Sequence, residues 1–96
     1  MSKIDEILNT IRAHKESLFS KYSISSMAMF GSYARNTETG QSDLDIVVEF
    51  SDKIGIRFID LADELEKMVG IKIDLVSKKG IKEKYYKNIV QDLIYV

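Results

Sequence analysis

The strongest chemical signal in the sequence is a pair of aspartates, Asp43 and Asp45, at the start of an alternating apolar stretch. On a β-strand, residues i and i+2 project on the same side, about 6–7 Å apart at a rise of roughly 3.3 Å per residue. Two carboxylates this close repel each other, and a divalent cation removes that cost. Mg²⁺ prefers one or two carboxylates together with substrate phosphates. The alternative is a solvated strand end that carries two charges.

A second signal is the pair Gly31 and Ser32, which follows the short apolar run Met27-Ala28-Met29-Phe30. A glycine at the point where a strand turns into a helix lets the backbone approach a ligand closely. The N–H groups at the start of a helix favour phosphate, and the serine hydroxyl can donate one more hydrogen bond. Taken alone, a Gly-Ser pair is weak evidence for a binding site.

The third signal is Asp74, a single acidic residue inside the apolar stretch from Ile71 to Val76. A carboxylate in that position is unfavourable unless it is paired, hydrogen-bonded or bound to a metal. Its predicted strand face is opposite to that of Ile73 and Leu75. If this strand lies beside the strand that carries Asp45, three carboxylates converge. The alternative is an aspartate that accepts backbone hydrogen bonds at a strand edge.

The elements that must position these residues follow from hydrophobic periodicity, and they predict one α/β (α+β) domain over residues 1–96. Ser2 and Asp5 form a candidate cap for the first helix. Residues 31–42 begin with a helical turn and become a polar loop, and Gly70 ends the second long helix. The predicted helices cover 3–22, 54–69 and 80–93, and the predicted strands cover 27–30, 43–50 and 71–76.

Composition excludes several classes of protein. Lys plus Arg is 14 and Asp plus Glu is 15, so the formal net charge is −1, which argues against a dedicated nucleic-acid-binding domain. No cysteine is present, which rules out disulfides, zinc–thiolate sites and thiol catalysis. The longest apolar runs are far shorter than a membrane span, and the N-terminus has no apolar signal-peptide core. We therefore expect a cytoplasmic protein with no membrane contact.

Together, the Gly-Ser pair, the Asp-x-Asp motif and the later isolated aspartate resemble the nucleotidyltransferase superfamily that includes DNA polymerase beta. The run from Gly31 to Arg35 and from Ser42 to Asp45 is most similar to the minimal nucleotidyltransferase (MNT) family. The resemblance covers essentially the whole chain and implies a small mixed sheet with flanking helices. Asn36 stands where that family usually has a glycine, and asparagine tolerates the left-handed conformation better than most residues.

The resemblance also implies residue roles. Asp43 and Asp45 would hold two Mg²⁺ ions, one of them shared with the triphosphate of ATP, and Asp74 would complete the second metal site. Asp74 would also orient or deprotonate an acceptor hydroxyl. Gly31 and Ser32 would hold the β- and γ-phosphates. Arg35 lies one helical turn after Ser32, so it could reach the same phosphates or stay in solvent.

MNT proteins often act as the antitoxin of a toxin–antitoxin pair with a HEPN-domain protein. The resemblance therefore implies transfer of AMP from ATP to a hydroxyl of a protein acceptor, a tyrosine of a cognate HEPN ribonuclease toxin. Two other functions remain open at this point. The chain could be a non-catalytic antitoxin that inhibits by binding, or the catalytic subunit of a two-chain transferase that acts on a small molecule. No stable binding of nucleic acid is expected.

The last quarter of the chain is rich in lysine and tyrosine. A basic face of this kind is usually only solvated, and its alternative role is to attract a nucleotide or an acidic partner surface. Tyr85, Tyr86 and Tyr95 exceed what one helix needs for its core face, so they are candidates for a protein interface. The lysines are Lys72, Lys78, Lys79, Lys82, Lys84 and Lys87.

Overall fold

A four-stranded mixed sheet forms the centre of the protein, for which a computed structural model describes residues 3–96. Its strand order is β3-β2-β1-β4. The central strand β1 is antiparallel to β2 and to β4, whereas β2 and β3 are parallel. The strands are β1 (Ile24–Phe30), β2 (Leu44–Phe50), β3 (Ile73–Ser77) and β4 (Ile94–Tyr95). The predicted fold class is confirmed.

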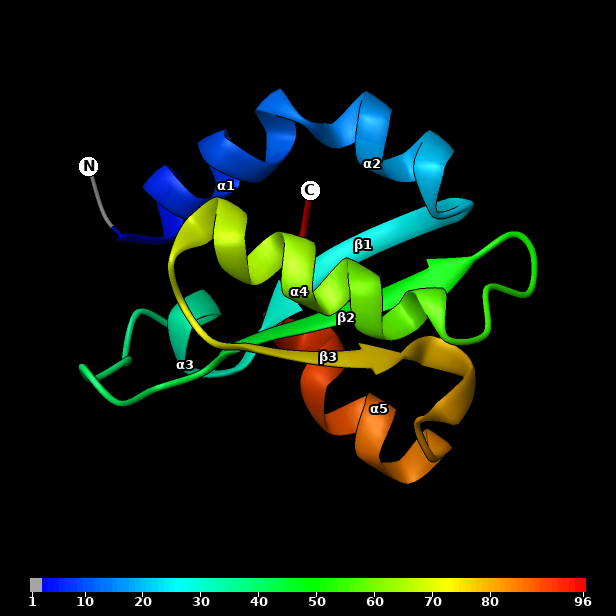
Figure 1. Cartoon of the computed structure of the whole chain (residues 1–96). Helices are drawn as coiled ribbons and strands as arrows, with labels where there is room; N and C mark the ends of the chain where they lie inside the picture. The colour runs from blue at the N-terminus through cyan, green and yellow to red at the C-terminus, as the bar shows by residue number, and fades with distance from the viewer. Residues whose placement is uncertain (1–2) are drawn as a thin grey trace.

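Helices cover both faces of this sheet (Figure 1). Three of them, α1, α2 and α4, lie on one face, and α5 lies on the other. Between residues 3 and 96, no helix is both long enough and apolar enough to cross a membrane. The helices are α1 (Lys3–Ala13), α2 (Lys15–Lys21), α3 (Gly31–Ala34), α4 (Arg57–Val69) and α5 (Glu83–Ile89), with 3-10 turns η1 (Lys78–Gly80) and η2 (Val90–Asp92).

The alternation of β2 divides its side chains between two apolar clusters of different size. Leu44, Ile46 and Val48 are fully buried against α1, α2 and α4 in the larger cluster. Val47 points to the opposite face, into a smaller cluster with Ile89 of α5. The first face therefore holds the main core. The second face has less apolar cover, and Asp45 shares it with Val47 because the two residues are two positions apart.

Two boundaries near the N-terminus differ from the sequence prediction. The first predicted helix is interrupted at His14, whose φ of −113° and ψ of 9° lie outside the helical region. The interruption leaves both Ile11 and Leu18 fully buried in the main core. The predicted cap of Ser2 lies outside the described residues.

The predicted strand 27–30 begins earlier in the structure, at Ile24. The two serines that interrupt the apolar pattern lie at an irregularity in the β1–β2 register, between Ile24 and Ser26. The exposed Ser25 hydroxyl donates a hydrogen bond to the Glu49 carbonyl oxygen at 3.0 Å. The irregularity therefore accommodates a polar residue within the strand.

The C-terminal prediction of one helix over 80–93 is wrong in its extent. The α-helix stops at Ile89, a 3-10 turn follows, and the chain then returns to the sheet as β4. The backbone N–H of Val96 donates to the Met27 carbonyl oxygen at 3.0 Å, which extends this pairing. A strand of two residues is too short to show alternation, so the sequence carries no periodic signal for it.

Candidate functional site

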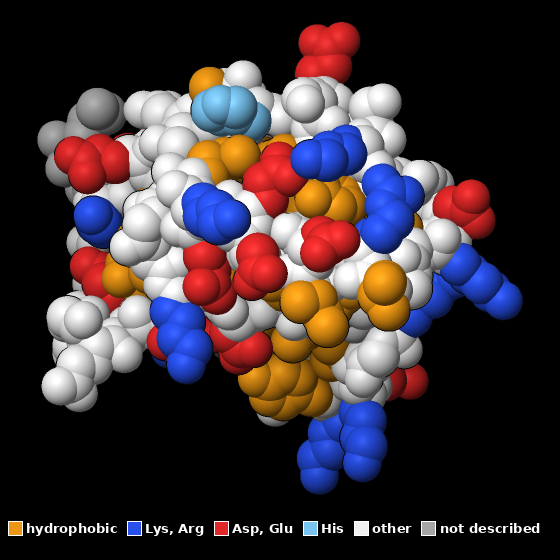
Figure 2. All heavy atoms as spheres, viewed as in Figure 1, with side chains coloured by type: hydrophobic (Ala, Val, Ile, Leu, Met, Phe, Trp, Pro, Cys, Tyr) orange, Lys and Arg blue, Asp and Glu red, His pale blue; other side chains and the backbone are white. Residues whose placement is uncertain are grey.

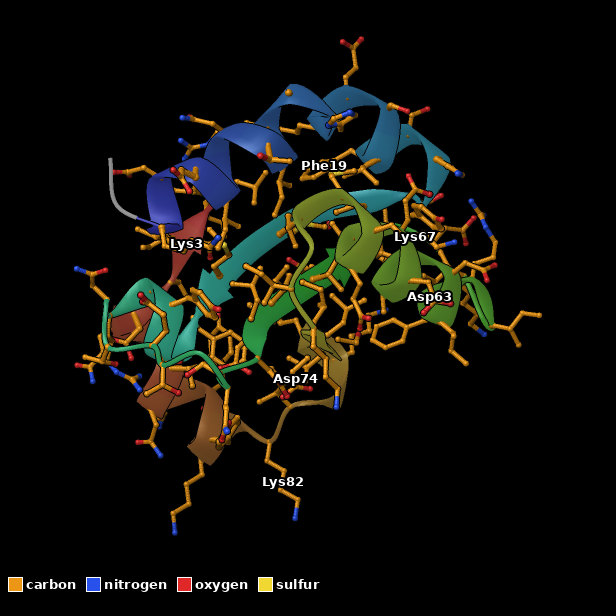
Figure 3. All side chains as sticks on the ribbon, turned by 60° about the vertical axis from the view of Figure 1, so that its left-hand side comes forward. Lys3, Phe19, Asp63, Lys67, Asp74 and Lys82 are labelled. Atoms are coloured by element: carbon orange, nitrogen blue, oxygen red, sulfur yellow. The ribbon has the colours of Figure 1, made fainter. Side chains whose placement is uncertain are left out.

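Asp45 and Asp74 are register partners on the adjacent parallel strands β2 and β3. Partners in a parallel pair project on the same face, and here that face is the one with the smaller apolar cluster. Figure 3 shows Asp74 at the lower side of the sheet, away from α1. Of the three carboxylates expected to converge, Asp45 and Asp74 are therefore brought together by the pairing of their strands. Asp43 lies two residues before Asp45, just outside β2, and its side chain is exposed.

The environment of Asp45 opposes ionisation. Burial, followed by the negative charge of Asp74 and a hydrogen bond with it, raises the pKa of Asp45 to about 6. The charge of Asp43 acts in the same direction, whereas the Arg35 guanidinium lowers the pKa. A carboxyl group in this state gains from a nearby cation, because the cation offsets the repulsion that the folded chain itself imposes. Asp45 is therefore a candidate for binding a cation.

Gly31 is placed directly against Asp45. The residue before it, Phe30, is the register partner of Asp45 across β1 and β2. Gly31 has a φ of +77°, and a Cβ atom built on it would collide with Asp45 Oδ2. Both observations require glycine at this position, because other residues rarely adopt this φ and the carboxylate occupies the space of their side chain. The chain turns into α3 at this glycine, as the sequence predicts.

Ser32 follows Gly31 in α3 and is half-buried. Its carbonyl oxygen accepts a hydrogen bond from the Thr37 backbone N–H at 2.8 Å, which closes the turn after α3. No described residue hydrogen-bonds the Ser32 hydroxyl, so this group remains available to a ligand at the end of β1. Asn36 has a φ of 62°, which is the left-handed conformation that the sequence analysis expects at the usual glycine position.

Arg35 is engaged by another side chain. Its Nη1 lies 3.0 Å from Asp92 Oδ2, in the 3-10 turn after α5. The side chain of Arg35 is half-exposed, whereas that of Asp92 is mostly buried. The guanidinium still lowers the pKa of Asp45, so it lies on the same side of the protein as the carboxylates. Arg35 is thus a half-exposed residue that an ion pair with Asp92 holds on the side of the site, and its role as a phosphate ligand stays a prediction.

A family model for the nucleotidyltransferase domain matches residues 11–96, which is most of the chain. The chain belongs to the nucleotidyltransferase domain family. A candidate protein adenylyltransferase from Methanocaldococcus jannaschii is 49% identical over the full length of both chains. The protein adenylyltransferase MntA of Thermococcus cleftensis is 33% identical, over 100% of this chain and 98% of its own. The nucleotidyltransferase therefore has full-length relatives.

Two solved structures share the fold of this nucleotidyltransferase. A candidate minimal nucleotidyltransferase superposes with a TM-score of 0.75 at 26% identity, over 98% of this chain and 95% of its own. A structure of the tri-AMPylated Shewanella oneidensis HEPN toxin in complex with MNT antitoxin matches with a TM-score of 0.60 at 20% identity. That match covers 97% of this chain and 67% of the other. The small mixed sheet with flanking helices is thus the fold of minimal nucleotidyltransferases.

The carboxylates of this nucleotidyltransferase fit Mg²⁺ in donor type, since carboxylate oxygen is what this ion prefers. Burial and the charge of Asp74 raise the pKa of Asp45 by more than the Arg35 guanidinium lowers it, so a further positive charge would favour the ionised pair. Within residues 3–96, however, no three acidic or histidine side chains are arranged to hold an ion by themselves. Mg²⁺ at this site would therefore need ligands from the nucleotide phosphates, in addition to carboxylates.

Sequence reasoning missed Asp92, which holds Arg35 beside the carboxylates. The two residues are separated by 57 positions, and Asp92 lies in a segment that the sequence predicts as plain helix. No motif or periodicity points to it. Only the return of the chain toward β1 through η2 and β4 brings this carboxylate to the end of the sheet where α3 begins.

Proposed function

We propose that this nucleotidyltransferase moves AMP from ATP to a hydroxyl of a protein acceptor, namely a tyrosine of a cognate HEPN toxin. The observation that carries the proposal is the pairing of Asp45 with Asp74 directly against Gly31. A glycine turn that faces two repelling carboxylates is suited to a cation and a phosphate chain, and to little else. The names of the relatives support adenylyl transfer to protein, and the AMPylated toxin complex supports the class of acceptor.

The reaction assigns a distinct task to each group. Gly31 and Ser32 bind the β- and γ-phosphates through the backbone N–H and the free hydroxyl. Asp43 and Asp45 would hold two Mg²⁺ ions together with the nucleotide, and Asp74 would contribute to the second of them. When bound, Mg²⁺ neutralises charge at the reacting phosphorus and at the pyrophosphate leaving group. Arg35 adds positive charge on the same side of the site, from its position beside Asp92.

The acceptor hydroxyl is placed by Asp74, which lies on the outer strand of the sheet. The hydroxyl oxygen attacks the α-phosphorus of ATP, a new O–P bond forms, and the bond to the bridging α–β oxygen breaks. Pyrophosphate leaves, and the hydroxyl proton passes to Asp74. The modified tyrosine of the ribonuclease toxin then carries a bulky phosphoester. Because the modification is covalent, we expect inhibition of the toxin to outlast the contact between the two proteins.

Thermal unfolding with ATP, GTP, CTP or UTP, each with and without Mg²⁺, tests the nucleotide site. Ligand at about ten times its dissociation constant should add roughly 1.4 kcal/mol to the free energy of unfolding. For a domain of this size, that raises Tm by several degrees, at about 4–8 °C per kcal/mol. We expect the rise with ATP plus Mg²⁺ in the wild type, and no rise in Asp43→Asn/Asp45→Asn.

A transfer assay tests the chemistry. The wild type, incubated with α-labelled ATP, Mg²⁺ and a HEPN-domain toxin from the same organism, should label its cognate toxin on tyrosine. Asp74→Asn should lose turnover more than it loses the ATP-induced rise in Tm, because Asp74 acts on the acceptor. Inhibition of the toxin without label would instead establish the non-catalytic antitoxin. Label on a free metabolite alone would establish a small-molecule transferase.

A further inference from the structure

A groove of about 610 Å³ runs along the outer edge of β3. β3 is the terminal strand of the sheet, so β2 is its only strand partner. Phe58 of α4 lines one side of the groove, and Ile81, Lys82 and Tyr85 line the other side. Figure 2 shows hydrophobic side chains gathered in this part of the surface, with basic side chains at its lower margin. The groove is therefore apolar inside and basic at its rim.

The backbone of β3 presents unpaired hydrogen-bonding groups to this groove. The Lys72 carbonyl oxygen accepts from Leu44 N–H at 2.8 Å, on the β2 side, whereas Ile73 N–H donates outward to Glu66 Oε2 at 3.2 Å. Backbone groups alternate between the two edges of a strand. Leu75 therefore points its N–H and C=O groups outward, and Ser77 points its N–H outward, whereas the Ser77 carbonyl oxygen belongs to the 3-10 turn η1 that follows. Both residues line the groove. An open strand edge of this kind pairs readily with another extended chain.

The groove begins next to the candidate catalytic carboxylates. Leu75 and Val76 follow Asp74 directly in β3, so the groove starts roughly 3.3 Å further along the strand. Val76 projects on the same face as Asp74, because the two residues are two positions apart. Tyr85 of α5 closes the groove on that face. A chain that lies in the groove therefore continues directly to the position where Asp74 would hold an acceptor hydroxyl.

The rim of the groove is positively charged and incompletely neutralised. Lys78 pairs with Glu49 at 3.7 Å. Within the described part of the chain, Lys79, Lys82 and Lys84 have no ion-pair partner. Lys82 lines the groove itself, and Lys79 lines the adjacent hollow that shares Ser77 with it. Tyr85 is 54% exposed, which leaves a large aromatic surface uncovered beside these charges. The complementary ligand is acidic and carries at least one apolar or aromatic side chain.

We propose that this groove binds an extended acidic segment of the protein acceptor, which adds to the sheet as a strand beside β3 and presents its tyrosine to Asp74. The proposal rests on the proposed adenylyl transfer and specifies how the acceptor is selected. A second copy of this chain fits less well. Its clustered acidic residues, Asp60, Asp63, Glu64 and Glu66, lie on α4, whose backbone groups are already used within the helix.

Random copolymers are suitable probes, because they supply the acceptor chemistry without a known partner sequence. A copolymer of glutamate and tyrosine offers an acidic extended chain with acceptor hydroxyls, and a copolymer of lysine and tyrosine offers the same hydroxyls with the opposite charge. With α-labelled ATP and Mg²⁺, the wild type should label the glutamate–tyrosine copolymer. Lys82→Glu and Tyr85→Ser should each raise KM for it at least about tenfold, while the ATP-induced rise in Tm persists.

Lys3→Glu is the matched control, because it changes the net charge by the same amount as Lys82→Glu. Lys3 lies on α1, on the opposite side of the sheet from α5, and Figure 3 shows it far from Lys82 in that view. The KM of the Lys3→Glu variant for the acidic copolymer should equal that of the wild type. Lys82→Glu should also improve use of the lysine–tyrosine copolymer, which a merely destabilised variant would not do.

The outcomes separate this proposal from the proposed function. A wild type that binds ATP with Mg²⁺ but neither binds nor labels the acidic copolymer overturns the groove assignment and leaves the nucleotide site in place. Equal KM values for the acidic copolymer in Lys82→Glu, Tyr85→Ser and Lys3→Glu also overturn the groove assignment and leave the nucleotide site in place. A dimer in sedimentation that Tyr85→Ser dissociates would show that a second copy fills the groove, and this also overturns the assignment. The absence of any ATP-induced rise in Tm overturns the proposed function itself.

Discussion

Two acidic side chains of this nucleotidyltransferase are in opposite electrostatic situations. Glu64 on α4 accepts from Lys21 Nζ at 2.8 Å and from Tyr22 Oη at 2.9 Å, and these contacts lower its pKa. Asp45 on β2 faces Asp74 and is partly buried, and its pKa rises to about 6. The first carboxylate has its partners within the folded chain. For the second, burial and two neighbouring carboxylates oppose the charge more strongly than Arg35 favours it.

The contrast shows how a structural acid differs from an acid that awaits a ligand. Glu64 joins α4 to the end of α2, and its ionised form favours the folded state. Ionised Asp45 opposes folding, since a raised pKa means that the folded chain prefers the neutral carboxyl. A residue that costs stability is expected where a ligand supplies the missing interaction. In the proposed function, this ligand is a cation with a phosphate chain, and the position of Asp45 against Gly31 supports that proposal.

Exchange of each carboxylate for its amide should separate the two roles most strongly in the transfer reaction. Asp45→Asn should lower adenylyl transfer by about 10³-fold, because charge stabilisation by a bound metal is worth several kcal/mol in the transition state. Glu64→Gln should leave transfer unchanged, because the hydrogen-bond partners of Glu64 among residues 3–96 are Lys21 and Tyr22, which lie outside the candidate site. Initial rates with saturating ATP and Mg²⁺ measure both effects. Comparable rates for Asp45→Asn and the wild type would refute the metal assignment.

Gly31→Ala should give the next largest effect. The new methyl group would displace the Asp45 carboxylate, and the φ of +77° is strained for alanine. We expect a loss of about 1–3 kcal/mol in the free energy of unfolding, together with loss of the ATP-induced rise in Tm. Gly70→Ala provides a control, since Gly70 has a similar φ of +71° with open space around its Cβ position. It should be destabilised by strain alone and keep its response to ATP.

The charged pair at the site could be predicted from sequence better than its surroundings could. Alternation around Asp45 and Asp74 is a local property, and it correctly places both residues opposite the main core face. The left-handed turn at Asn36 follows from its side chain in the same local way. The ion pair of Arg35 with Asp92 depends on the path of the chain between them. The open edge of β3 depends on the order of the strands in the sheet, which cannot be derived from periodicity.

The pH dependence of stability should have opposite signs for the two carboxylates in metal-free protein. The pKa of Asp45 is raised, so its contribution to stability is full below the unfolded value near 3.8 and is lost as pH rises through about 6. Asp45→Asn should therefore stabilise the protein at pH 7 by on the order of 1–2 kcal/mol, and by much less at pH 4. Urea unfolding in EDTA measures the difference.

Glu64 provides the opposite slope. Its pKa is lowered, so its contribution is present above the unfolded value near 4.5 and is lost as pH falls through the folded value. Glu64→Gln should therefore destabilise the protein at pH 7 and have little effect near pH 3. Parallel pH profiles for the Asp45 and Glu64 variants would contradict the assigned environments.

Tyr22→Phe should produce the smallest of these effects and define what holds Glu64. The Tyr22 ring is buried, and only its hydroxyl reaches Glu64 Oε1. Removal of that oxygen leaves the ring packing intact and the Lys21 contact in place. We expect a loss of about 1 kcal/mol in the free energy of unfolding at pH 7, with an unchanged rate of adenylyl transfer.

In acid, where Glu64 is protonated and is a weaker hydrogen-bond acceptor, the loss caused by Tyr22→Phe should be smaller. An equal loss at pH 3 would mean that the hydroxyl stabilises the fold without the ionised carboxylate. A loss confined to neutral pH would show that the buried hydroxyl and the lysine together keep this carboxylate ionised, whereas the surroundings of Asp45 favour its neutral form.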